Sequence, residues 1–315
     1  MMEHKSVLLH ETVDSLNVRP DGIYVDGTLG RGGHARLVLE QLTTGHLYAF
    51  DKDEQALAES EENLKELLDH ITMIHGDYST MKEALHARGV DVVNGVMMDL
   101  GVSSPQFDDP ERGFSYRYDA RLDMRMDQSQ ELDAWKIVNT YSEEDLRRIL
   151  WQYGEERNAG RIARAIAATR QQHPIDTTFQ LVDVIRSALP AKVLNQKGHP
   201  AKQSFQALRI EVNHELDSLK EGLQEACSLL DVQGRCAVIT FQSLEDRIVK
   251  DTFRSLSSAP FVEPKLPIKA SQMEQASFRL VNRKPITAGE EETEENHRAH
   301  SAKLRVIERT RKTGL

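Results

Sequence analysis

The segment from Asp26 to His34 carries the clearest chemical signal of the sequence. It reads Asp-Gly-Thr-Leu-Gly-Arg-Gly-Gly-His, follows a short apolar run and opens an amphipathic stretch. Glycines at a strand-to-helix connection permit a tight turn and a close approach of the backbone to a ligand. The turn therefore predicts contacts with an adenosine-type cofactor from Asp26, Gly30, Gly32, Gly33 and His34.

Two cofactor classes fit such a turn. In dinucleotide-binding proteins the helix terminus receives a pyrophosphate. In proteins that bind S-adenosylmethionine, an acid at the end of the first strand, here Asp26, can hold the ammonium group. The dinucleotide glycine pattern is not met, because Gly33 is followed by His34, Ala35 and Arg36. The turn favours the methyl donor, and the dinucleotide alternative stays open at this point.

Acidic residues also end the next two apolar runs. Asp51, 21 residues beyond Gly30, is placed to accept both ribose hydroxyls of an adenosine. Asp53 is the neighbouring alternative, although an acid directly before a helix is often only its cap. Asp77-Tyr78 can meet the adenine, with the Tyr78 ring packed on it; without the other two sites, Tyr78 would be interpreted as a core residue.

The fourth apolar run ends in the segment Asp99-Leu-Gly-Val-Ser-Ser-Pro-Gln-Phe107. At the end of their fourth strand, methyltransferases that act on exocyclic amines carry an acid, Asn or Ser, which is followed by two prolines and an aromatic residue. Gln106 stands where the second proline would be. An amine conjugated to a base ring is a poor nucleophile, so an acceptor for one of its hydrogens would localise the lone pair. Candidate acceptors are a backbone carbonyl and the side chains of Asp99, Ser103 and Ser104.

Phe107 is a candidate for stacking on a base that is turned out of its helix. The alternative is a Ser-Pro loop start followed by a buried Phe. Methylation at a cytosine ring carbon would need a thiol nucleophile, and neither Cys227 nor Cys236 neighbours a strand end. Direct attack by nitrogen on the sulfonium methyl group is therefore the better mechanism, with the protein supplying orientation and a water-poor pocket. The cysteine spacing matches no metal motif, and no metal is expected.

The elements that position these residues alternate as β and α through the first hundred residues, which is typical of a parallel sheet. Ligands bind at the carboxyl ends of the strands in such sheets, so the acids there are site candidates together. The expected strands are 23–26, 46–51, 72–75, 92–99, 236–241, 277–282 and 302–309. The expected helices of this part are 35–42, 54–68, 80–88, 205–230 and 244–256, and the acidic stretch 290–295 is expected to be a surface loop.

The alternation stops after Leu100, and helices without strands follow over 132–139, 143–151, 156–170 and 179–189. This pattern predicts an all-helical insertion at 108–204 within a discontinuous α/β domain formed by 1–107 and 205–315. The insertion is expected to recognise the substrate.

The net charge of −10 at first argues against a polyanionic partner, because phosphate contacts need Lys and Arg. The stretch from Asp108 to Arg209 nevertheless holds 16 Lys and Arg against 15 Asp and Glu, a net charge of +1. Arg157, Arg161 and Arg164 recur there at helical spacing and are candidates for contacts with phosphate, the alternative being a solvated helix face. No apolar stretch is long enough to span a membrane, and a cytoplasmic location is expected.

Several motifs together resemble the bacterial RsmH or MraW family of small-subunit ribosomal RNA cytosine N4-methyltransferases, nearly from end to end. No dehydrogenase shares this series. The motifs are His4–Glu11, Tyr24–His34, Asp99–Gln106, Glu111–Asp127, Tyr153–Ala165, Phe205–Leu216 and Ser243–Lys250.

The resemblance implies a Rossmann-like class I methyltransferase fold with a mostly parallel seven-stranded sheet and an inserted helical domain. It implies a cytidine in the decoding region of 16S ribosomal RNA as the target, and a homodimer. The weak overall basicity of the chain adds the expectation that this RNA is recognised within a small-subunit particle. The implied cofactor is S-adenosylmethionine, with contacts from Gly32, Gly33, His34, Asp51, Tyr78, Asp99 and Gln106.

Two departures from the family pattern lie near the carboxyl end. Where the family commonly has His after an Ile-Ser-Phe strand, this chain has Gln242 after Ile-Thr-Phe. Gln242 can still form a hydrogen bond to a base in the target pocket, but a proton-transfer role for His is excluded there. The usual Asn-Pro-Arg-Ala-Arg run is Asn-His-Arg-Ala-His at 296–300.

Overall fold

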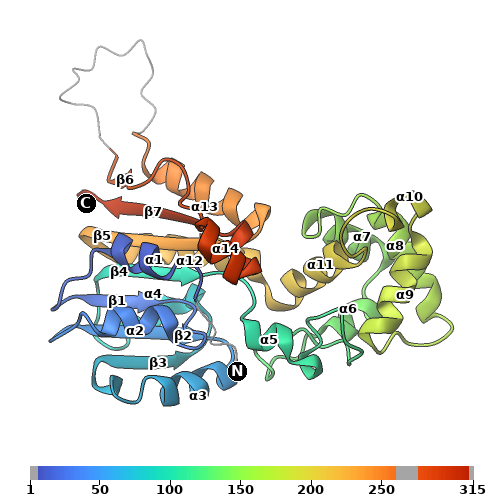
Figure 1. Cartoon of the computed structure of the whole chain (residues 1–315), viewed down its shortest axis with the longest axis horizontal. Coiled ribbons are helices and arrows are strands. Elements are labelled where there is room, and N and C mark those ends of the chain that lie inside the picture. The colour runs from blue at the N-terminus through green and yellow to red at the C-terminus, as the bar shows by residue number, and fades with distance from the viewer. Residues whose placement is uncertain (1–5, 260–275, 312–315) are drawn as a thin grey trace, which may run out of the picture. The chain divides into compact units, whose positions relative to one another are not determined.

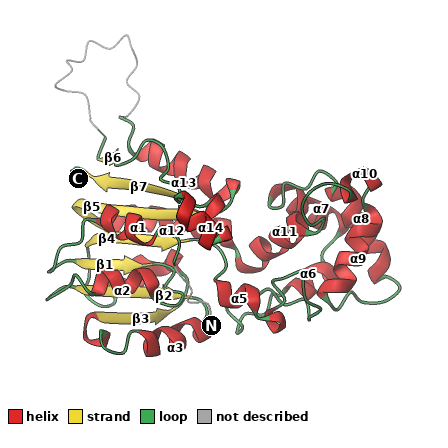
Figure 2. Ribbon diagram, viewed as in Figure 1, coloured by secondary structure: helices red, strands yellow, loops and turns green. Residues whose placement is uncertain are grey.

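The computed structural model describes residues 6–259 and 276–311, and its chain forms two compact units. The sheet unit comprises Met1–Gly101 and Leu216–Leu315, and the helical unit comprises Val102–Glu215. Figure 1 shows the strands gathered in the first unit, while Figure 2 shows the second to be built of helices and loops. The chain therefore leaves the sheet unit after its fourth strand and returns to it before the fifth.

The sheet unit is built on seven strands in the order β3-β2-β1-β4-β5-β7-β6. β1 to β5 run parallel, and β7 runs antiparallel to both of its neighbours. This is the expected Rossmann-like class I methyltransferase fold with a mostly parallel seven-stranded sheet. The strands are β1 (Ile23–Asp26), β2 (His46–Asp51), β3 (Ile71–His75), β4 (Val93–Asp99), β5 (Leu230–Thr240), β6 (Phe278–Leu280) and β7 (Lys303–Arg309).

Both faces of the sheet are buried under helices. Successive strand residues point to opposite sides, so each strand contributes side chains to two apolar clusters. In β1, Tyr24 packs in one apolar cluster and Val25 in the other; in β4, Met97 and Met98 divide in the same way. The first face is covered by α1 (Leu9–Leu16), α2 (Gly33–Leu39) and α3 (Glu54–Asn63). The second is covered by α4 (Met81–His86), α12 (Glu215–Leu229) and α13 (Ser243–Leu256).

The helical unit has its own core, whose buried side chains come from most of its helices. α7 and α8 pack against each other, and α8 also packs against α9. The helices are α5 (Ser104–Asp108), α6 (Ala134–Thr140), α7 (Glu143–Gln152), α8 (Ala159–Arg170), α9 (Thr178–Ala188), α10 (Ala191–Leu194) and α11 (Lys202–Asn213).

The expected single helix over 205–230 is wrong, because the chain breaks at His214. This residue has a left-handed backbone (φ 52°), which ends α11 and separates it from α12. α11 packs on α6 and α7, so its residues belong to the helical unit. The unit consequently extends over 102–215, beyond the predicted insertion at 108–204 on both sides.

The acidic stretch Glu290–Glu295 forms a helix, α14, rather than the expected loop. Glutamates in its first turn interact favourably with the positive end of the helix dipole. The Glu292 carboxylate also accepts a hydrogen bond from the backbone N–H of Leu8 at 2.8 Å. This contact ties the segment to the start of the chain. The helix α1 had no counterpart among the expected elements.

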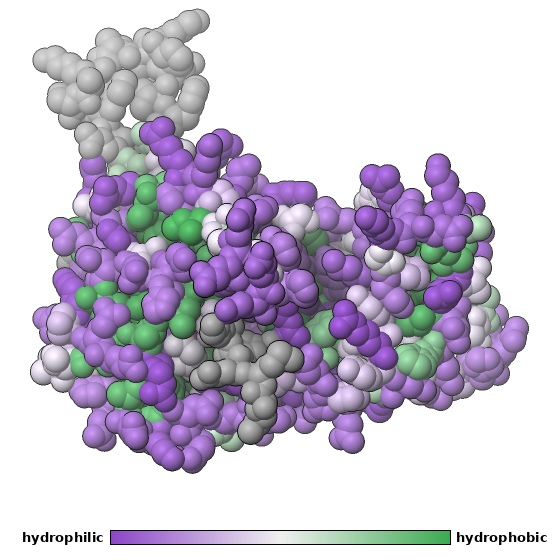
Figure 3. Space-filling model, viewed as in Figure 1, coloured by the Kyte–Doolittle hydropathy of each residue, from purple (hydrophilic) through white to green (hydrophobic). Residues whose placement is uncertain are grey.

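No helix in the described ranges is long and apolar enough to cross a bilayer. On the face seen in Figure 3, polar side chains predominate and hydrophobic atoms form separate patches. Isolated apolar patches of this kind are ordinary on folded proteins.

Candidate cofactor and methyl-transfer site

Three predicted site acids meet at the carboxyl edge of the sheet. Asp26 ends β1, and its partners in the flanking strands are Ala49 in β2 and Met97 in β4. Asp51 and Asp99 each lie two residues beyond these partners, at the ends of their strands. The parallel register therefore gathers the three carboxyl groups around the start of the glycine turn.

The glycine turn is held to both neighbouring strands by hydrogen bonds. Gly30 has a left-handed backbone (φ +53°), and its N–H donates to Asp51 Oδ2 at 2.8 Å. Thr28 donates its N–H to Asp26 Oδ1 at 3.0 Å and accepts the backbone N–H of Asp99 on its hydroxyl at 2.6 Å. At Gly32 (φ +79°) an added Cβ would come within 2.9 Å of Leu64. Glycine is thus required at this point for both conformation and space.

Burial raises the pKa of all three carboxyl groups. The pKa of Asp26 rises to about 7 and that of Asp51 to about 6, because burial outweighs the backbone hydrogen bonds that each receives. The pKa of Asp99 rises to about 8 through burial and through the neighbouring charges of Asp26 and Glu245. Among the described residues, no Lys or Arg forms an ion pair with these three acids. A cationic ligand would favour their ionised forms, so this edge fits the positively charged S-adenosylmethionine.

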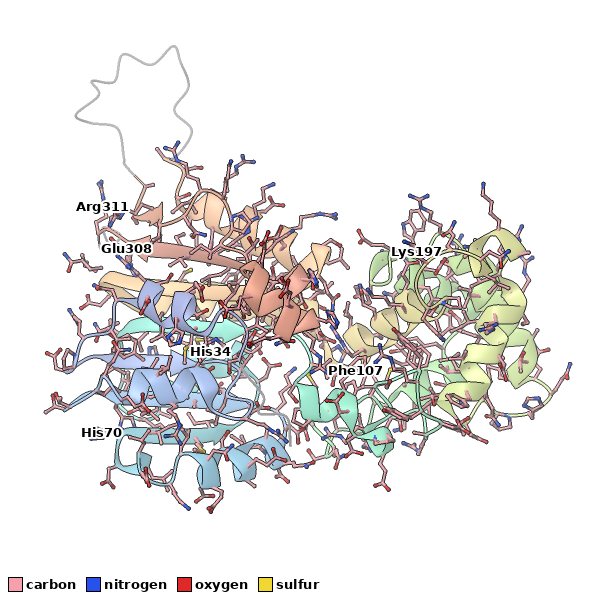
Figure 4. The ribbon with its side chains drawn as sticks, in the orientation of Figure 1. His34, His70, Phe107, Lys197, Glu308 and Arg311 are labelled. Atoms are coloured by element: carbon pink, nitrogen blue, oxygen red, sulfur yellow. The ribbon has the colours of Figure 1, made fainter. Side chains whose placement is uncertain are left out.

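His34, labelled in Figure 4, lies at the start of α2 and approaches Asp99. Burial lowers its pKa to about 4, so the imidazole is neutral at pH 7. Its Nε2 lies 3.2 Å from the carbonyl oxygen of Val7, which can only accept, and Nε2 therefore carries the proton. The unprotonated Nδ1 faces Asp99 Oδ2 at 4.0 Å. His34 is thus positioned as a neutral acceptor rather than as a cation.

Two buried oxygen atoms at this edge have no hydrogen-bond partner. They are Asp99 Oδ1 and Gln242 Oε1. β4 and β5 are neighbours, with Asp99 opposite Ile239, so Gln242 follows the adjacent strand end. A buried acceptor without a donor is costly unless a ligand supplies one. These two oxygens mark the place where a substrate N–H group can be received.

Glu245 also belongs to this edge, and sequence reasoning did not find it. Its buried carboxylate accepts the backbone N–H groups of Phe241 at 2.9 Å and Gln242 at 3.1 Å. It thereby fixes the start of α13 and the position of Gln242. The Gln-Ser-Leu-Glu spacing, with an acid three residues after the residue before a helix, was an available signal for such a cap.

Asp53 is a helix cap, as the alternative interpretation held. Its Oδ1 accepts the N–H of Gln55 at 3.1 Å.

Asp77 is engaged in an ion pair with Lys52 and in hydrogen bonds within the sheet unit. Burial raises its pKa, but the charge of Lys52 and several hydrogen bonds outweigh this and hold the pKa below its usual value. Ser218 also donates its hydroxyl proton to Asp77 Oδ2 at 2.5 Å.

Tyr78 packs closely against two glycines of the sheet unit. A Cβ at Gly27 would come within 3.1 Å of the Tyr78 Cβ, and a Cβ at Gly222 would overlap its ring. The side chain is half-buried and contributes to one of the two apolar clusters of the sheet unit. A contact between Tyr78 and adenine stays a prediction.

The segment Ser103–Phe107 belongs to the helical unit, where it has a local structural role. Ser103 caps α5 through a reciprocal pair: its N–H donates to Gln106 Oε1 at 3.1 Å and its hydroxyl accepts the Gln106 N–H at 3.4 Å. Phe107, labelled in Figure 4, packs against the core of this unit. The cofactor role of Gln106 and the stacking role of Phe107 stay predictions, and the Ser104 side chain lies outside the described residues.

The three predicted arginines are exposed on the helical unit. Arg157 precedes α8, while Arg161 and Arg164 lie on it, the latter 3.7 Å from Glu143 of α7. On α7, which packs against α8, Trp151 has an exposed fraction of 61%, the largest among the large hydrophobic residues exposed in the described chain. An exposed indole on the same unit as exposed arginines suits stacking on a base. Sequence reasoning placed this Trp only at the end of the expected helix 143–151 and gave it no role, although it lies four residues from Arg147 and so shares its face.

The comparisons with known proteins agree with this geometry. The model of the MraW methylase family matches residues 1–310. The chain belongs to this family. It is similar to proteins named ribosomal RNA small subunit methyltransferase H from Lactiplantibacillus plantarum (53% identity, 99% of this chain, 98% of the relative) and Lactobacillus gasseri (52% identity, 98% and 99%).

A third relative of the same name, from Limosilactobacillus fermentum, is 51% identical over 97% of this chain and 98% of its own length. The protein is therefore a methyltransferase, and its cofactor is S-adenosylmethionine. The dinucleotide alternative is wrong. Among the described residues, no group of three or more His, Cys, Asp or Glu is arranged to hold a metal ion.

Proposed function

We propose that this methyltransferase transfers a methyl group to the exocyclic N4 amine of a cytidine in the decoding region of 16S ribosomal RNA. The observation that carries the proposal is the unpartnered Oδ1 of Asp99 at the end of β4. It is a buried acceptor at the strand end where amine methyltransferases need one. The relatives named as small-subunit ribosomal RNA methyltransferases support the RNA class of the substrate.

The chemistry proposed is a direct displacement. The bound cofactor supplies an electrophilic methyl group on a sulfonium ion. Asp99 and Gln242 accept the amine hydrogens, which keeps the nitrogen lone pair available for attack. Transfer would form the N–C bond and leave the electron pair of the broken C–S bond on sulfur as a neutral thioether, and the amine would lose one proton. Ionised Asp99, with its pKa raised to about 8, would be basic enough to accept that proton.

The two cysteines argue against methylation at a ring carbon. Cys227 lies in α12 and Cys236 in β5, and both are buried in the apolar cluster on one face of the sheet. Their mutual hydrogen bond and burial raise the pKa of Cys236 well above its usual value. Neither thiol can serve as the nucleophile that attack through a cytosine carbon requires. Nitrogen is therefore the acceptor atom that the residues support.

The helical unit is proposed to bind the RNA through its exposed arginines and Trp151. Because the net charge of the chain is −10, we infer that the shape of an assembled small-subunit particle contributes to recognition. A homodimer, implied by the family resemblance, is a separate proposal that light scattering of the purified protein will test.

The deciding experiment combines transfer with product analysis. Small-subunit particles and free ribosomal RNA from cells lacking the protein are incubated with labelled S-adenosylmethionine, and the nucleosides are identified by mass spectrometry. We expect N4-methylcytidine at one position of the decoding region. Label at another base or at carbon 5 of cytosine would refute the chemistry proposed, and no incorporation into either substrate would favour a non-catalytic binding protein.

A further inference from the structure

A cavity of about 240 Å³ lies in the sheet unit, between α13 and the strands β6 and β7. It is distinct from the cofactor edge. Arg305 and Val306 of its wall pair with Val238 and Ala237 of β5, two to three residues before the strand reaches Thr240. The lining residues are Lys250, Phe253, Arg254, Leu280, Asn282, Arg283, Arg305 and Val306.

Asn282 builds one wall of this cavity. Its Oδ1 accepts the N–H of Val306 at 2.8 Å, and its Nδ2 donates to the carbonyl oxygens of Lys284 and Leu304, both at 2.9 Å. The side chain thus takes the place of a strand backbone beyond the end of β6. These bonds fix the turn that follows, and Arg283 is held at the cavity on a rigid support.

The cavity concentrates positive charge that the protein does not neutralise. Lys250, Arg254 and Arg283 are exposed, and no carboxylate in the described ranges pairs with any of them. Arg305 is paired with Asp246, by bonds of 2.7 and 3.2 Å, but Asp246 also receives Lys303, so this cluster keeps one positive charge. Neighbouring like charges repel each other, and an anion bound between them relieves that repulsion.

The size and floor of the cavity narrow the class of anion. Phe253 and Val306 are buried and Leu280 is half-buried, which gives an apolar floor beneath the cationic rim. Pockets for whole small ligands usually have volumes of about 300–1,000 Å³, above the value found here. A phosphate with its sugar, as part of a longer chain, suits a cavity of this size better than a complete cofactor.

We propose that this cavity, the α13 cleft, binds the sugar-phosphate backbone of an RNA strand outside the methyl-transfer site. The proposal rests on the RNA substrate proposed above. The sheet unit would then have its own RNA contact, made to the sugar-phosphate backbone and not to the bases. The cleft would therefore contribute to affinity and to salt dependence, with no part in the transfer step.

Two adjacent residues provide a matched test. Arg283 lines the cleft, and Lys284, next to it on the same turn, does not. Binding of a fluorescein-labelled oligouridine is measured by anisotropy over a series of salt concentrations. Uridine has no exocyclic amine, so the assay is independent of the transfer reaction. We expect Arg283→Glu to raise the Kd about fivefold and to lower the slope of log K against log salt by about 0.7. Lys284→Glu should change neither by a comparable amount.

Two further measurements keep the outcomes separate. Thermal unfolding and the Kd of S-adenosylmethionine should match the wild type in both variants, and Arg283→Gln replaces Arg283→Glu if they do not. If Arg283→Glu and Lys284→Glu weakened the binding of oligouridine equally, the proposal that RNA binds in the α13 cleft would be refuted. The proposed methyl transfer to RNA would be unaffected by that result. Isothermal titration with inorganic phosphate and uridine monophosphate supplies the last arm. Binding of either as tightly as oligouridine would show a small-anion site and would also overturn the proposal.

Discussion

The three acids at the carboxyl edge of the sheet and Asp123 of the helical unit respond to burial in opposite ways. In the sheet unit, burial raises the pKa values of Asp26, Asp51 and Asp99, and no Lys or Arg among the described residues pairs with them. In the helical unit, burial also opposes ionisation of Asp123, but hydrogen bonds and charges from Arg125 and Arg121 outweigh it and lower its pKa.

This difference distinguishes acids that await a ligand from acids that support the fold. Uncompensated carboxyl groups cost stability and are found where a ligand completes the charge balance. Asp123 and Asp133 of the helical unit are already balanced by arginines, so they stabilise the fold. The remaining exposed arginines there are available for a polyanion. The following predictions test this contrast.

The largest effect is expected at Asp99. Asp99→Asn keeps the shape and one acceptor oxygen but removes the carboxylate charge and its ability to take up a proton, so transfer to small-subunit particles should fall about 100-fold or more. The measurement is the single-turnover rate with labelled cofactor. Asp53→Asn is the control, since Asp53 caps α3, Asn also caps helices, and the substitution should leave the rate almost unchanged. An equal loss of rate in both variants would remove the distinction between site acids and structural acids.

Cofactor affinity should depend on pH through the same acids. Their ionised forms favour a cation, so the affinity for S-adenosylmethionine should rise about tenfold as the pH increases from about 6 to about 8. Isothermal titration at several pH values measures this change together with the protons released. In Asp99→Asn the dependence should weaken, since one of the three titrating groups is gone. An affinity independent of pH over this window would contradict the assignment of these carboxyl groups to the cofactor.

In the ligand-free protein, the change of stability with rising pH should have opposite signs in the two units. A carboxyl group whose folded pKa is raised above 3.8 binds protons more tightly when folded. The sheet unit should therefore lose stability as the pH rises from about 4 to about 8. Asp123, whose pKa is lowered, stabilises the helical unit above its unfolded value, and this contribution is lost as the pH falls below about 4. Hydrogen exchange resolved by unit will distinguish the two trends.

A smaller effect is expected on the arginine face of the helical unit. Arg161→Glu should raise the Kd for ribosomal RNA about fivefold and leave cofactor affinity unchanged. Arg170→Glu is a contrasting variant, because the Arg170 guanidinium donates to the carbonyls of Val138 and Tyr141 and so supports the fold. It should lower the unfolding temperature instead. Equal losses of RNA and cofactor affinity in Arg161→Glu would show that this face is structural.

The smallest effect is expected at the cap of α5. Ser103→Ala removes the hydroxyl that accepts the Gln106 N–H and should destabilise the helical unit by about 1 kcal/mol. Denaturant unfolding measures this loss, and the transfer rate at saturating substrate measures catalysis. A rate loss well beyond that of a structural cap would restore Ser103 as a candidate acceptor.

Much of the sheet unit was predictable, because its strands are short apolar runs that end in polar residues. The bounds of β1 and β2 agree with those expected, and the family follows from motifs read directly along the chain. The break at His214 was not predictable. The apolar periodicity continues through it, and only packing of α11 on α6 and α7 decides that the helix stops there.

By itself, the sequence determined which residues could do the chemistry: the acids at the strand ends and the glycine turn between them. Local patterns suffice for this, because each acid directly follows its own apolar run. The tertiary structure alone decided which acids act together. Neighbouring parallel strands bring Asp26, Asp51 and Asp99 to one edge and leave Asp99 Oδ1 without a partner, while Asp53 caps α3 and Asp77 pairs with Lys52 and Ser218. Burial and pairing depend on residues far apart in the chain, and no local pattern records them.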